Sequence, residues 1–344
     1  MNPYVCIIIL NWNNWHDTLE CLKSVFNIDY QEYQVVIVDN GSEDNSISMI
    51  KKFCHDHKTS DKKPIELLEL EEGDLKLFSS KKSNLKTYYS DEQLILIKNS
   101  RNYGFTKGNN IAIEFVFQNF TADYILLLNN DTIVDNQFLN ELIRVGESDK
   151  NIGFIGPKIY FYEYAGKQYS KIIQYAGGKQ NLWTFEPSPI GYGEIDRGQY
   201  EKNRKVDFIS GACLLAKTPM IREIGLLDED FFSYREENDW CMRANERGWS
   251  TFFAFKSIIW HKSQGSTKNK NFKPILLYYM TRNRFLFMKK HATKGQLTIF
   301  FIYFFLFDYW YRIVVSLVYH QQPKLVFCLI EAVKDGLKVL IEKR

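Results

Sequence analysis

Cysteine is scarce in this sequence and follows no recognisable pairing pattern. The six cysteines show no Cys-x-x-Cys spacing, and two of them fall within predicted strands. This arrangement favours reduced thiols in the core of a cytosolic protein over a disulfide framework. No signal peptide is expected before the first strand, which is predicted to start by Tyr4.

The chain also lacks an excess of charge of one sign. It carries 44 Lys and Arg against 41 Asp and Glu, a net charge of +3, and the basic residues are spread along the sequence. Nucleic-acid-binding proteins gather basic residues in a patch, so no nucleic-acid partner is expected. With 45% hydrophobic residues among 344, the chain can bury a large core plus an appended module, and we expect a main domain over residues 1–290.

What the sequence does contain is an apolar run that stops abruptly at polar residues. The run 124–128 ends in Asn129, Asn130 and Asp131, which indicates a buried strand that delivers oxygen ligands at its carboxyl end. One carboxylate, an amide carbonyl and phosphate oxygens suit a hard cation such as Mg²⁺ or Mn²⁺. Taken alone, a strand followed by an Asx-type turn is at least as good an interpretation.

A second strand ends in the same way upstream. The run 34–38 stops at Asp39, and a first strand begins almost at the N-terminus, with helical spacing over 17–26 between the two. These segments predict a βαβ unit. A short strand at 94–97 and a helix at 108–119 follow, so we expect an α/β fold with a mostly parallel sheet flanked by helices.

Seven sequence blocks then occur in one order between residue 5 and about residue 287. They are Ile-Ile-Leu-Asn11-Trp-Asn, Val-Asp39-Asn-Gly-Ser, Arg101-Asn-Tyr-Gly-Phe-Thr-Lys-Gly-Asn-Asn110, Leu-Asn-Asn-Asp131-Thr, Gly211-Ala-Cys-Leu-Leu, Glu236-Glu-Asn-Asp-Trp-Cys-Met-Arg243 and Trp260-His-Lys. With these blocks the chain resembles the family 2 glycosyltransferases of GT-A fold, a Rossmann-like fold, and in particular the rhamnosyltransferase-like bacterial enzymes that build cell-surface polysaccharides. Each block alone is weak evidence, whereas their ordered conjunction is strong.

The resemblance implies a site for a nucleotide-sugar donor. Asp39 would accept the N3–H of uracil or thymine, which cytosine lacks, so UDP- and dTDP-sugars both remain open. The alternative for Asp39 is a tight turn before a helix that begins near Ser46, and the glycine-containing segment after Arg101 could be an ordinary strand-to-helix connection. The donor-binding candidates are Asn11, Asp39, Asn102, Gly104, Asn109, Asn129, Asn130 and Arg282.

The resemblance makes Asp131 the metal-binding carboxylate and His261 a second candidate ligand. The family's Asp-x-Asp motif begins here with Asn129, so one carboxylate is available instead of two. The loss either weakens metal affinity or favours Mg²⁺ bound largely through the phosphates. We expect Mg²⁺ or Mn²⁺ as the cofactor. A lone histidine is more often structural than a ligand, which is the alternative for His261.

The block that starts at Glu236 supplies acids for the reaction. An inverting transferase needs a carboxylate that takes the proton of the acceptor hydroxyl. The family motif reads Glu-Asp-x-Asp and its second acid is the base, so the resemblance points to Glu237, with Glu236 and Asp239 as the other candidates. Asp239 could instead pair with Arg243 four residues on. Without the resemblance, an acidic helix N-terminus favoured by the helix dipole is the simpler interpretation.

Two regions interrupt the α/β pattern. Residues 58–92 are rich in lysine and acids, and we expect a flexible surface insertion without function. The loops of residues 163–205 could frame an acceptor pocket in which Trp183, Phe185 and Tyr192 stack on sugar rings, or these three side chains could simply pack.

Residues 291–344 change in character to hydrophobic and amphipathic helices. The apolar stretch 297–319 is long enough to span a membrane, but Asp308 and Arg312 lie in its middle, where a charge costs roughly 2.5–3.5 kcal/mol. Its aromatic residues suit the headgroup boundary, and an amphipathic helix follows at 324–342. We expect helices that lie in the cytoplasmic leaflet of the inner membrane, with an oligomer interface or a helical cap as the alternative.

The sequence therefore predicts an inverting, metal-dependent glycosyltransferase that moves a sugar from UDP or dTDP to a hydroxyl of a glycan or polyprenyl-linked glycan. A sugar-phosphate nucleotidylyltransferase is a second hypothesis, but it needs a glycine-rich basic loop after the first strand, where Asn11-Trp-Asn-Asn-Trp-His stands. A non-catalytic scaffold of polysaccharide assembly is a third, kept open by Asn129. The transferred sugar, acceptor, linkage and oligomeric state depend on features that motifs do not encode.

Overall fold

The computed structural model describes residues 2–57, 64–75, 93–262 and 274–341. Its centre is an eleven-stranded sheet, in which β10 (Ile173–Tyr175) pairs with β7 and β6 (Thr132–Val134) pairs with β15. The other strands follow the order β13 (Arg204–Lys205), β15 (Ser250–His261), β7 (Ile152–Phe161), β14 (Cys213–Lys217), β5 (Tyr124–Asn129), β1 (Val5–Asn11), β2 (Tyr33–Asp39), β4 (Gln93–Lys98) and β3 (Glu66–Glu71). Two hairpins stand apart from this sheet, β8 (Glu163–Tyr164) with β9 (Lys167–Gln168) and β11 (Gly178–Asn181) with β12 (Glu186–Pro189).

The strands β3, β4, β2, β1 and β5 form the parallel half of the sheet. Apart from the partly buried Leu10, the Val, Ile and Leu side chains of β1, β2 and β4 are buried, as in a sheet that is covered on both faces. The register sets Asn11 opposite Asp39, and Leu10 opposite Asn129. The polar ends of β1, β2 and β5 therefore meet at one edge of the sheet.

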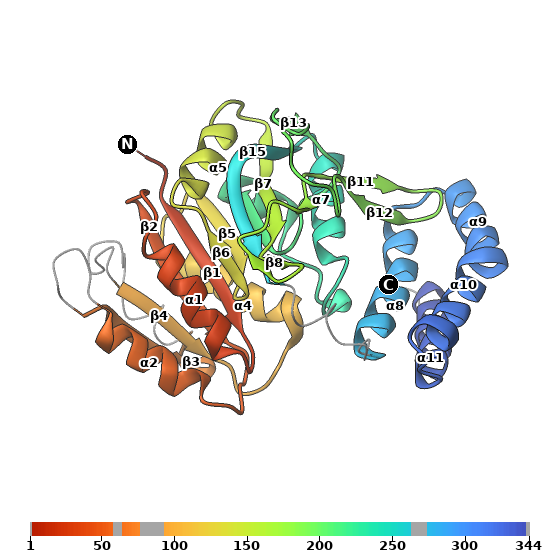
Figure 1. Cartoon of the computed structure of the whole chain (residues 1–344), viewed down its shortest axis with the longest axis horizontal. Helices are drawn as coiled ribbons and strands as arrows, with labels where there is room; N and C mark the ends of the chain where they lie inside the picture. The colour runs from red at the N-terminus through yellow and green to blue at the C-terminus, as the bar shows by residue number, and fades with distance from the viewer. Residues whose placement is uncertain (1, 58–63, 76–92, 263–273, 342–344) are drawn as a thin grey trace.

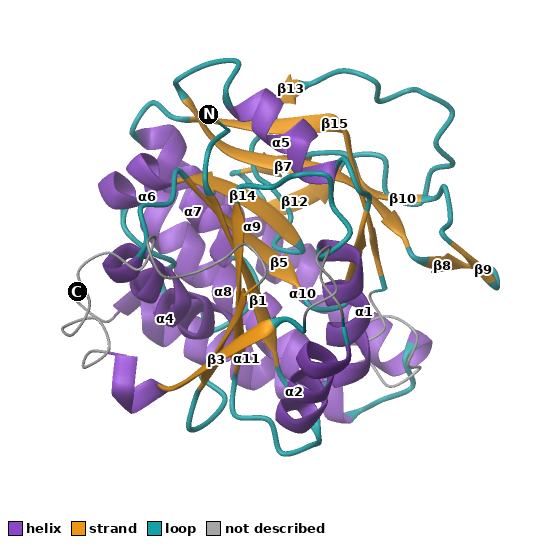
Figure 2. Ribbon diagram, turned by 90° about the vertical axis from the view of Figure 1, so that its left-hand side faces the viewer, coloured by secondary structure: helices purple, strands orange, loops and turns teal. Residues whose placement is uncertain are grey.

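Helices α1 (Trp15–Val25), α2 (Ser46–Asp56) and α4 (Gly104–Asn119) connect the parallel strands. They lie where the sequence predicts helices, except that α4 begins at Gly104 instead of Gly108. Helices α5 (Phe138–Gly146), α6 (Thr218–Ile224) and α7 (Glu236–Glu246) belong to the second half of the domain, and Figure 2 shows helices on both sides of the sheet. The predicted α/β fold is confirmed.

The second half of the sheet is mixed. β14 runs antiparallel to both β5 and β7, whereas β15 runs parallel to β7. The short strand β6 pairs antiparallel with the end of β15, which sets His261 opposite Thr132. This pairing brings the residues after β5 close to the last residue of β15.

The expectation that residues 58–92 form a flexible insertion outside the sheet is wrong for part of this segment. Residues 66–71 form β3, an edge strand parallel to β4, and a 3-10 turn follows at Glu72–Asp74. The alternation of Leu with Glu suits an edge strand with one solvated side, and a side chain of this turn, Glu72, accepts hydrogen bonds from Ser100 and Tyr103. The rest of this expectation concerns residues 58–63 and 76–92, which lie outside the described residues.

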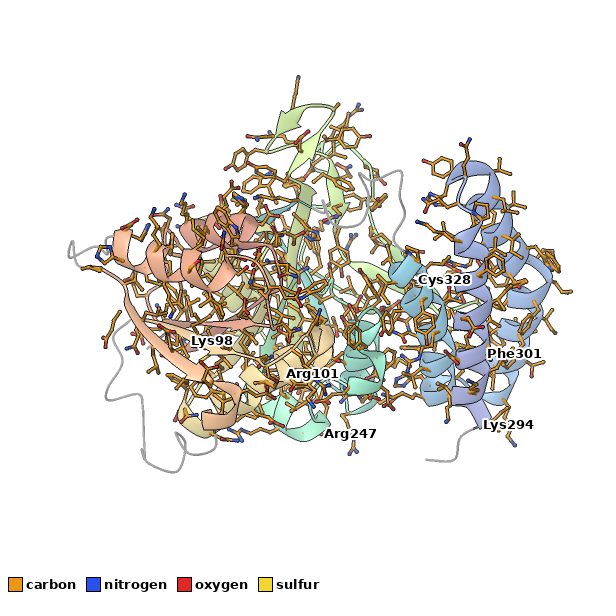
Figure 3. The ribbon with its side chains drawn as sticks, turned by 90° about the horizontal axis from the view of Figure 1, so that it is seen from below. Lys98, Arg101, Arg247, Lys294, Phe301 and Cys328 are labelled. Carbon is orange, nitrogen blue, oxygen red and sulfur yellow. The ribbon has the colours of Figure 1, made fainter. Side chains whose placement is uncertain are left out.

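The C-terminal helices gather at one end of the molecule, beside the sheet domain (Figure 1). They are α8 (Pro274–His291), a helix over Lys294–Tyr319 and α11 (Lys324–Ile341). The middle helix comprises α9 (Lys294–Tyr303) and α10 (Tyr309–Val314), with π-helical turns at Phe304–Asp308 and Val315–Tyr319. Phe301 and Cys328 lie in this helical group, and Lys98 and Arg101 lie on the side of the parallel strands (Figure 3).

In the helix Lys294–Tyr319, Asp308 faces the protein, whereas apolar side chains such as Leu306, Phe307 and Trp310 are exposed. Asp308 accepts hydrogen bonds from Arg312, at 2.7 Å, and from the buried Arg284 of α8. Arg284 also donates to Glu186 of β12 at 3.0 Å. Within the described residues this is the one helix long and apolar enough to cross a membrane, and 17% of its most apolar 18-residue window is buried.

Candidate functional site

The ends of β1 and β2 are joined by the side chain of Asn11. Its amide nitrogen donates to Asp39 Oδ2 at 2.8 Å, and the backbone N–H of Ser42 donates to Asp39 Oδ1 at 2.9 Å. Asp39 is 1% exposed. Each carboxylate oxygen already accepts one hydrogen bond, so a nucleobase would have to use a remaining lone pair.

Asn130 ties the end of β5 to the same group. Its amide nitrogen donates to Thr18 Oγ1 at 2.9 Å and to Asn11 Oδ1 at 3.3 Å, and the Thr18 hydroxyl donates to Asn11 Oδ1 at 2.7 Å. The structure thus brings together Asn11, Asp39 and Asn130, three residues predicted to bind the donor. Thr18 of α1 completes the network and has no signal in the sequence blocks.

Asn40 organises the loop that leads into α4. Its amide nitrogen donates to Asn102 Oδ1 at 3.0 Å and to the Gly104 carbonyl at 3.1 Å, and its oxygen accepts from Asn99 at 3.0 Å and from the Tyr103 N–H at 3.2 Å. Asn40 was not among the residues predicted to bind the donor. The available signal was its position directly after the predicted strand that ends at Asp39.

Gly104 allows this loop to touch the turn before α7. Its φ is +80°, and a Cβ atom there would lie 2.6 Å from the ring of Phe232. The N–H groups of Phe105 and Thr106 donate to the Phe232 carbonyl at 2.8 and 3.1 Å. Asn109, predicted to bind the donor, is buried and donates to the Phe105 carbonyl at 2.8 Å, a contact inside its own helix.

Asp131 and His261 face each other across the β6–β15 pair. Asp131 Oδ1 lies 3.0 Å from His261 Nε2, and His261 Nδ1 lies 2.9 Å from Gln174 Oε1. Burial is the largest single influence and works against the charge of both groups, but their mutual attraction, their hydrogen bond and the charges nearby together outweigh it. The pKa of Asp131 is therefore lowered and that of His261 is raised.

A carboxylate beside an imidazole fits a divalent cation as a partial ligand set. Residues 2–57, 64–75, 93–262 and 274–341 contain no group of three or more His, Cys, Asp or Glu that could hold a metal. A cation at Asp131 and His261 would therefore need further oxygen ligands, which a diphosphate supplies.

Glu236 and Glu237 begin α7 with unpartnered oxygens. Glu236 is 4% exposed, and among the described residues the Oε2 atoms of both acids are buried without a hydrogen-bond partner. Burial raises the pKa of both carboxyls; the charge of Glu237 raises that of Glu236 further, whereas Arg235 lowers both. Two buried acids held away from their ordinary pKa are typical of an acid–base site.

The acids of α7 and the metal candidates belong to one region. The N–H of Asn129 donates to the Ala212 carbonyl at 2.9 Å, and an added Cβ on the neighbouring Gly211 would lie 4.0 Å from Glu236 Oε1. The pKa of Tyr234 is raised by burial and then by the charges of Glu236, Glu237 and Asp131. These relations connect the end of β5 to the start of α7 through β14 and Tyr234.

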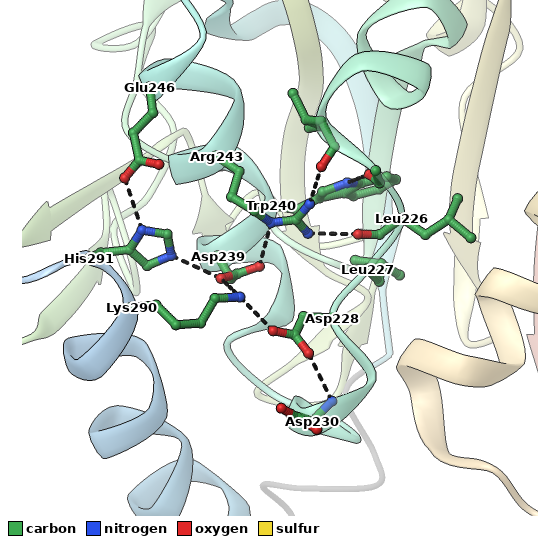
Figure 4. A network of polar contacts seen from close by, with 12 residues as sticks. Leu226, Leu227, Asp228, Asp230, Asp239, Trp240, Arg243, Glu246, Lys290 and His291 are labelled. Carbon is green, nitrogen blue, oxygen red and sulfur yellow. Dashed lines mark hydrogen bonds and ion pairs between the residues drawn. The ribbon is translucent and has the colours of Figure 1, made fainter. Parts of the chain in front are cut away.

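The third base candidate, Asp239, does not fit that role. Its carboxylate is fully buried and binds Arg243 at 2.8 Å, His291 at 2.9 Å and Lys290 (Figure 4). Burial raises its pKa, but His291, Arg243 and Lys290 together bring it far below the usual range. A carboxylate that binds Arg243, Lys290 and an imidazole is a poor proton acceptor, and the predicted pairing with Arg243 is confirmed.

Arg282 does not lie with the other donor-binding candidates, and Phe185 follows the packing alternative of its prediction. Arg282 donates to Asn283 Oδ1 at 3.1 Å and lines a cavity of about 500 Å³ together with Glu229 and Asp335, apart from the strand ends. Phe185 is fully buried and stacks on Phe287 with ring centroids 4.3 Å apart, so it packs in the core. The other two aromatic candidates, Trp183 and Tyr192, are exposed.

Comparisons with known proteins agree with this architecture. The family model for glycosyl transferase family 2 matches residues 6–77, and the model for glycosyltransferase like family 2 matches residues 83–274. The chain is 26% identical over 166 residues to the low-salt glycan biosynthesis hexosyltransferase Agl10 of Haloferax volcanii, covering 48% of this chain and 51% of Agl10. The chain therefore spans about half the length of that relative.

A second relative and a solved structure extend the comparison. The dTDP-rhamnosyl transferase RfbF of Shigella flexneri is 23% identical over 225 residues, which are 60% of this chain and 67% of RfbF. The crystal structure of GalNAc-T7 with UDP, GalNAc and Mn²⁺ has a TM-score of 0.56 and 14% identity, and covers 92% of this chain and 58% of that one. The likeness to GalNAc-T7 shows the fold alone. The two family models show that the chain belongs to the family 2 glycosyltransferases.

Proposed function

We propose that this protein is an inverting glycosyltransferase that moves a sugar from a UDP- or dTDP-sugar to a hydroxyl of a glycan or lipid-linked glycan. The observation that carries the proposal is the pair Glu236 and Glu237, whose buried Oε2 atoms lack hydrogen-bond partners and lie in the same region as Asp131 and His261. Family membership speaks against the nucleotidylyltransferase hypothesis.

Glu237 is the proposed base. As the acceptor oxygen attacks the anomeric carbon, its proton passes to the Glu237 carboxylate, and the bond between that carbon and the diphosphate oxygen breaks. The sugar becomes bonded to the acceptor oxygen with inverted configuration at the anomeric carbon. The nucleoside diphosphate leaves with the electron pair of the broken bond. Positioned general bases contribute roughly 10²–10⁴-fold to such reactions. Glu236, which shares the burial and the electrostatic coupling, is the neighbouring alternative.

Asp131 and His261 are the residues proposed to hold Mg²⁺ or Mn²⁺. A bound cation would stabilise the negative charge that develops on the leaving diphosphate. The Mn²⁺ in the GalNAc-T7 structure supports this choice for the fold. Asp39, held by Asn11 and Ser42, is proposed to select a diketo pyrimidine, in line with the UDP of that structure and the dTDP-sugar in the name of RfbF.

The membrane surface is the proposed place of action. The helix Lys294–Tyr319 turns Leu306, Phe307 and Trp310 outward, each more than half exposed, while its charged residues pair with the protein. Exposed apolar and aromatic side chains on a helix whose central Asp308 faces the protein suit the headgroup boundary of a bilayer. A polyprenyl-linked acceptor at the cytoplasmic face would meet the enzyme there.

The test is a panel of nucleotide sugars with added Mg²⁺ or Mn²⁺. We expect slow donor hydrolysis, or transfer to an added acceptor, with a UDP- or dTDP-sugar, and loss of either activity in Asp131→Ala. Asp135→Ala, which removes an acid outside the site, is the matched control. Full activity of Asp131→Ala would contradict the assignment, and binding of no nucleotide sugar would favour the scaffold hypothesis.

A further inference from the structure

The turn before α7 contains three strained residues within four positions. Phe232, Tyr234 and Arg235 have φ values of +59°, +68° and +78°. Residues with a Cβ atom avoid this region because that atom crowds the backbone carbonyl. Such a backbone persists only where its surroundings hold it in place, and it is found most often at functional sites.

Asn283 of α8 provides the hold on one side of the turn. Its side chain is fully buried, and its amide nitrogen donates to the carbonyls of Phe231, Ser233 and Tyr234 at 2.9, 2.8 and 2.7 Å. One side chain therefore serves three carbonyls of a turn that is about 50 residues away along the chain.

The loop before α4 holds the turn on the other side. The Phe232 carbonyl accepts from the N–H groups of Phe105 and Thr106, next to Gly104. The turn thus lies between the proposed donor loop and α8, and it leads directly into Glu236. A shift of the turn would move the first residues of α7, where the unpartnered acid oxygens are.

We propose that Asn283 is a positioning residue, which fixes the strained turn and through it the orientation of Glu236 and Glu237. It acts on the reaction through these acids and touches no substrate itself. The inference rests on the proposed function, because it assumes that one of the two acids is the base.

The first experiment compares Asn283→Asp with Asn119→Asp. Asn119 is a buried asparagine that donates to the Phe115 carbonyl at 2.8 Å, in the last turn of α4, so it matches the chemistry of the change away from the turn. In Asn283→Asp the side chain keeps its size but loses the N–H groups that bind the three carbonyls. We expect kcat to fall about 10- to 100-fold with donor KM changed less than about threefold, since displacement of a reacting group by ~1 Å costs on that scale. Asn119→Asp keeps its kcat.

The second experiment does not depend on activity. Amide hydrogen exchange over residues 232–239 is measured in the wild-type protein, Asn283→Ala and Asn119→Ala. Faster exchange in this segment only in Asn283→Ala supports the proposal. If both asparagine variants lower Tm alike while exchange over 232–239 and kcat stay at the wild-type level, Asn283 is merely structural and the proposal is overturned.

The two proposals fail in different ways. If the wild-type protein transfers no sugar, the proposed function fails, and the exchange experiment still decides whether Asn283 holds the turn. If the wild-type protein transfers sugar and loses this activity in Glu237→Gln, but Asn283→Asp is fully active, the positioning role fails and the proposed function stands.

Discussion

At the scale of single residues, the two acids of α7 combine catalytic use with a cost in stability. A glutamate whose pKa is raised by burial stabilises the fold in its protonated form, and this contribution is lost as pH rises through the raised pKa. The base must be ionised, so the protein works in the pH range where this contribution has gone.

Glu237→Gln tests both effects in one variant. We expect turnover to fall by roughly 10²–10⁴-fold, because glutamine cannot take the acceptor proton, while donor affinity is kept. We also expect Tm above the wild-type value at pH 8 and a smaller difference at pH 5, because glutamine carries no charge that must be buried. Turnover against pH, donor titration and melting curves measure the three quantities.

Glu236→Gln is the matched control, since it removes the neighbouring acid of the coupled pair. If Glu236→Gln loses turnover and Glu237→Gln keeps it, the role of base moves to Glu236. If neither variant changes turnover, the two acids do not serve the reaction.

Some of these residues could be predicted from the sequence and others could not. Asp39 and Asp131 follow apolar runs, which is a local signal for the carboxyl end of a strand. The roles of Asn40 and Asn283 depend on partners about 60 and 50 residues away, so no local pattern reports them. Asp239 was an ambiguous acid because its partners Lys290 and His291 come from a different helix.

At the scale of secondary structure, Gly104 governs how closely the donor loop approaches the turn before α7. In Gly104→Ala the added Cβ would lie 2.6 Å from Phe232, and the residue would keep φ near +80°. We expect a higher donor KM and a lower Tm, measured by steady-state kinetics and thermal melting.

Gly166→Ala distinguishes the effect of backbone strain at a positive φ from the effect of a steric clash with the added Cβ. Gly166 has φ of +79° but no atom within 4 Å of an added Cβ. The left-handed conformation alone costs roughly 1–2 kcal/mol, so this variant should lose stability without loss of donor binding. Equal donor KM values for the two variants would show that the contact between loop and turn has no part in donor binding.

Elements with two covered faces were predictable, because their apolar runs are continuous, as in β1, β2 and β5. The edge strand β3 was not, because its alternating Leu and Glu occur within a charged stretch that resembles a solvated loop. The mixed half of the sheet also lies beyond local patterns, since the direction of β14 depends on pairing with β5 and β7.

At the scale of the whole molecule, the helical end should bind lipid. Leu306→Ser, Phe307→Ser and Trp310→Ser combined should reduce binding to lipid vesicles at least about tenfold, because burying one large apolar side chain is worth roughly 1.5–3 kcal/mol. Vesicle flotation measures the bound fraction. Tyr164→Ser, at an exposed aromatic residue of β8, is the control that keeps binding.

If the triple variant floats with vesicles as well as the wild-type protein, the exposed face does not bind lipid. The alternatives are then a helical cap on the catalytic domain or an interface between copies of the chain. A change from monomer to dimer with protein concentration, lost in the same variant, would favour the second of these alternatives.

The ion pairs of Arg284 with Asp308 and Glu186 limit how this protein can be attached to a bilayer. Full insertion of the helix would pull Asp308 away from the buried Arg284 and leave that guanidinium with Glu186 as its one remaining carboxylate, so we expect the helix to stay docked with only its outer face in lipid. The height of the reaction centre above the headgroups is then a fixed property of the molecule. We expect such an enzyme to select acceptors by the distance of their reactive hydroxyl from the bilayer, and to prefer those in which this distance matches the height of the reaction centre.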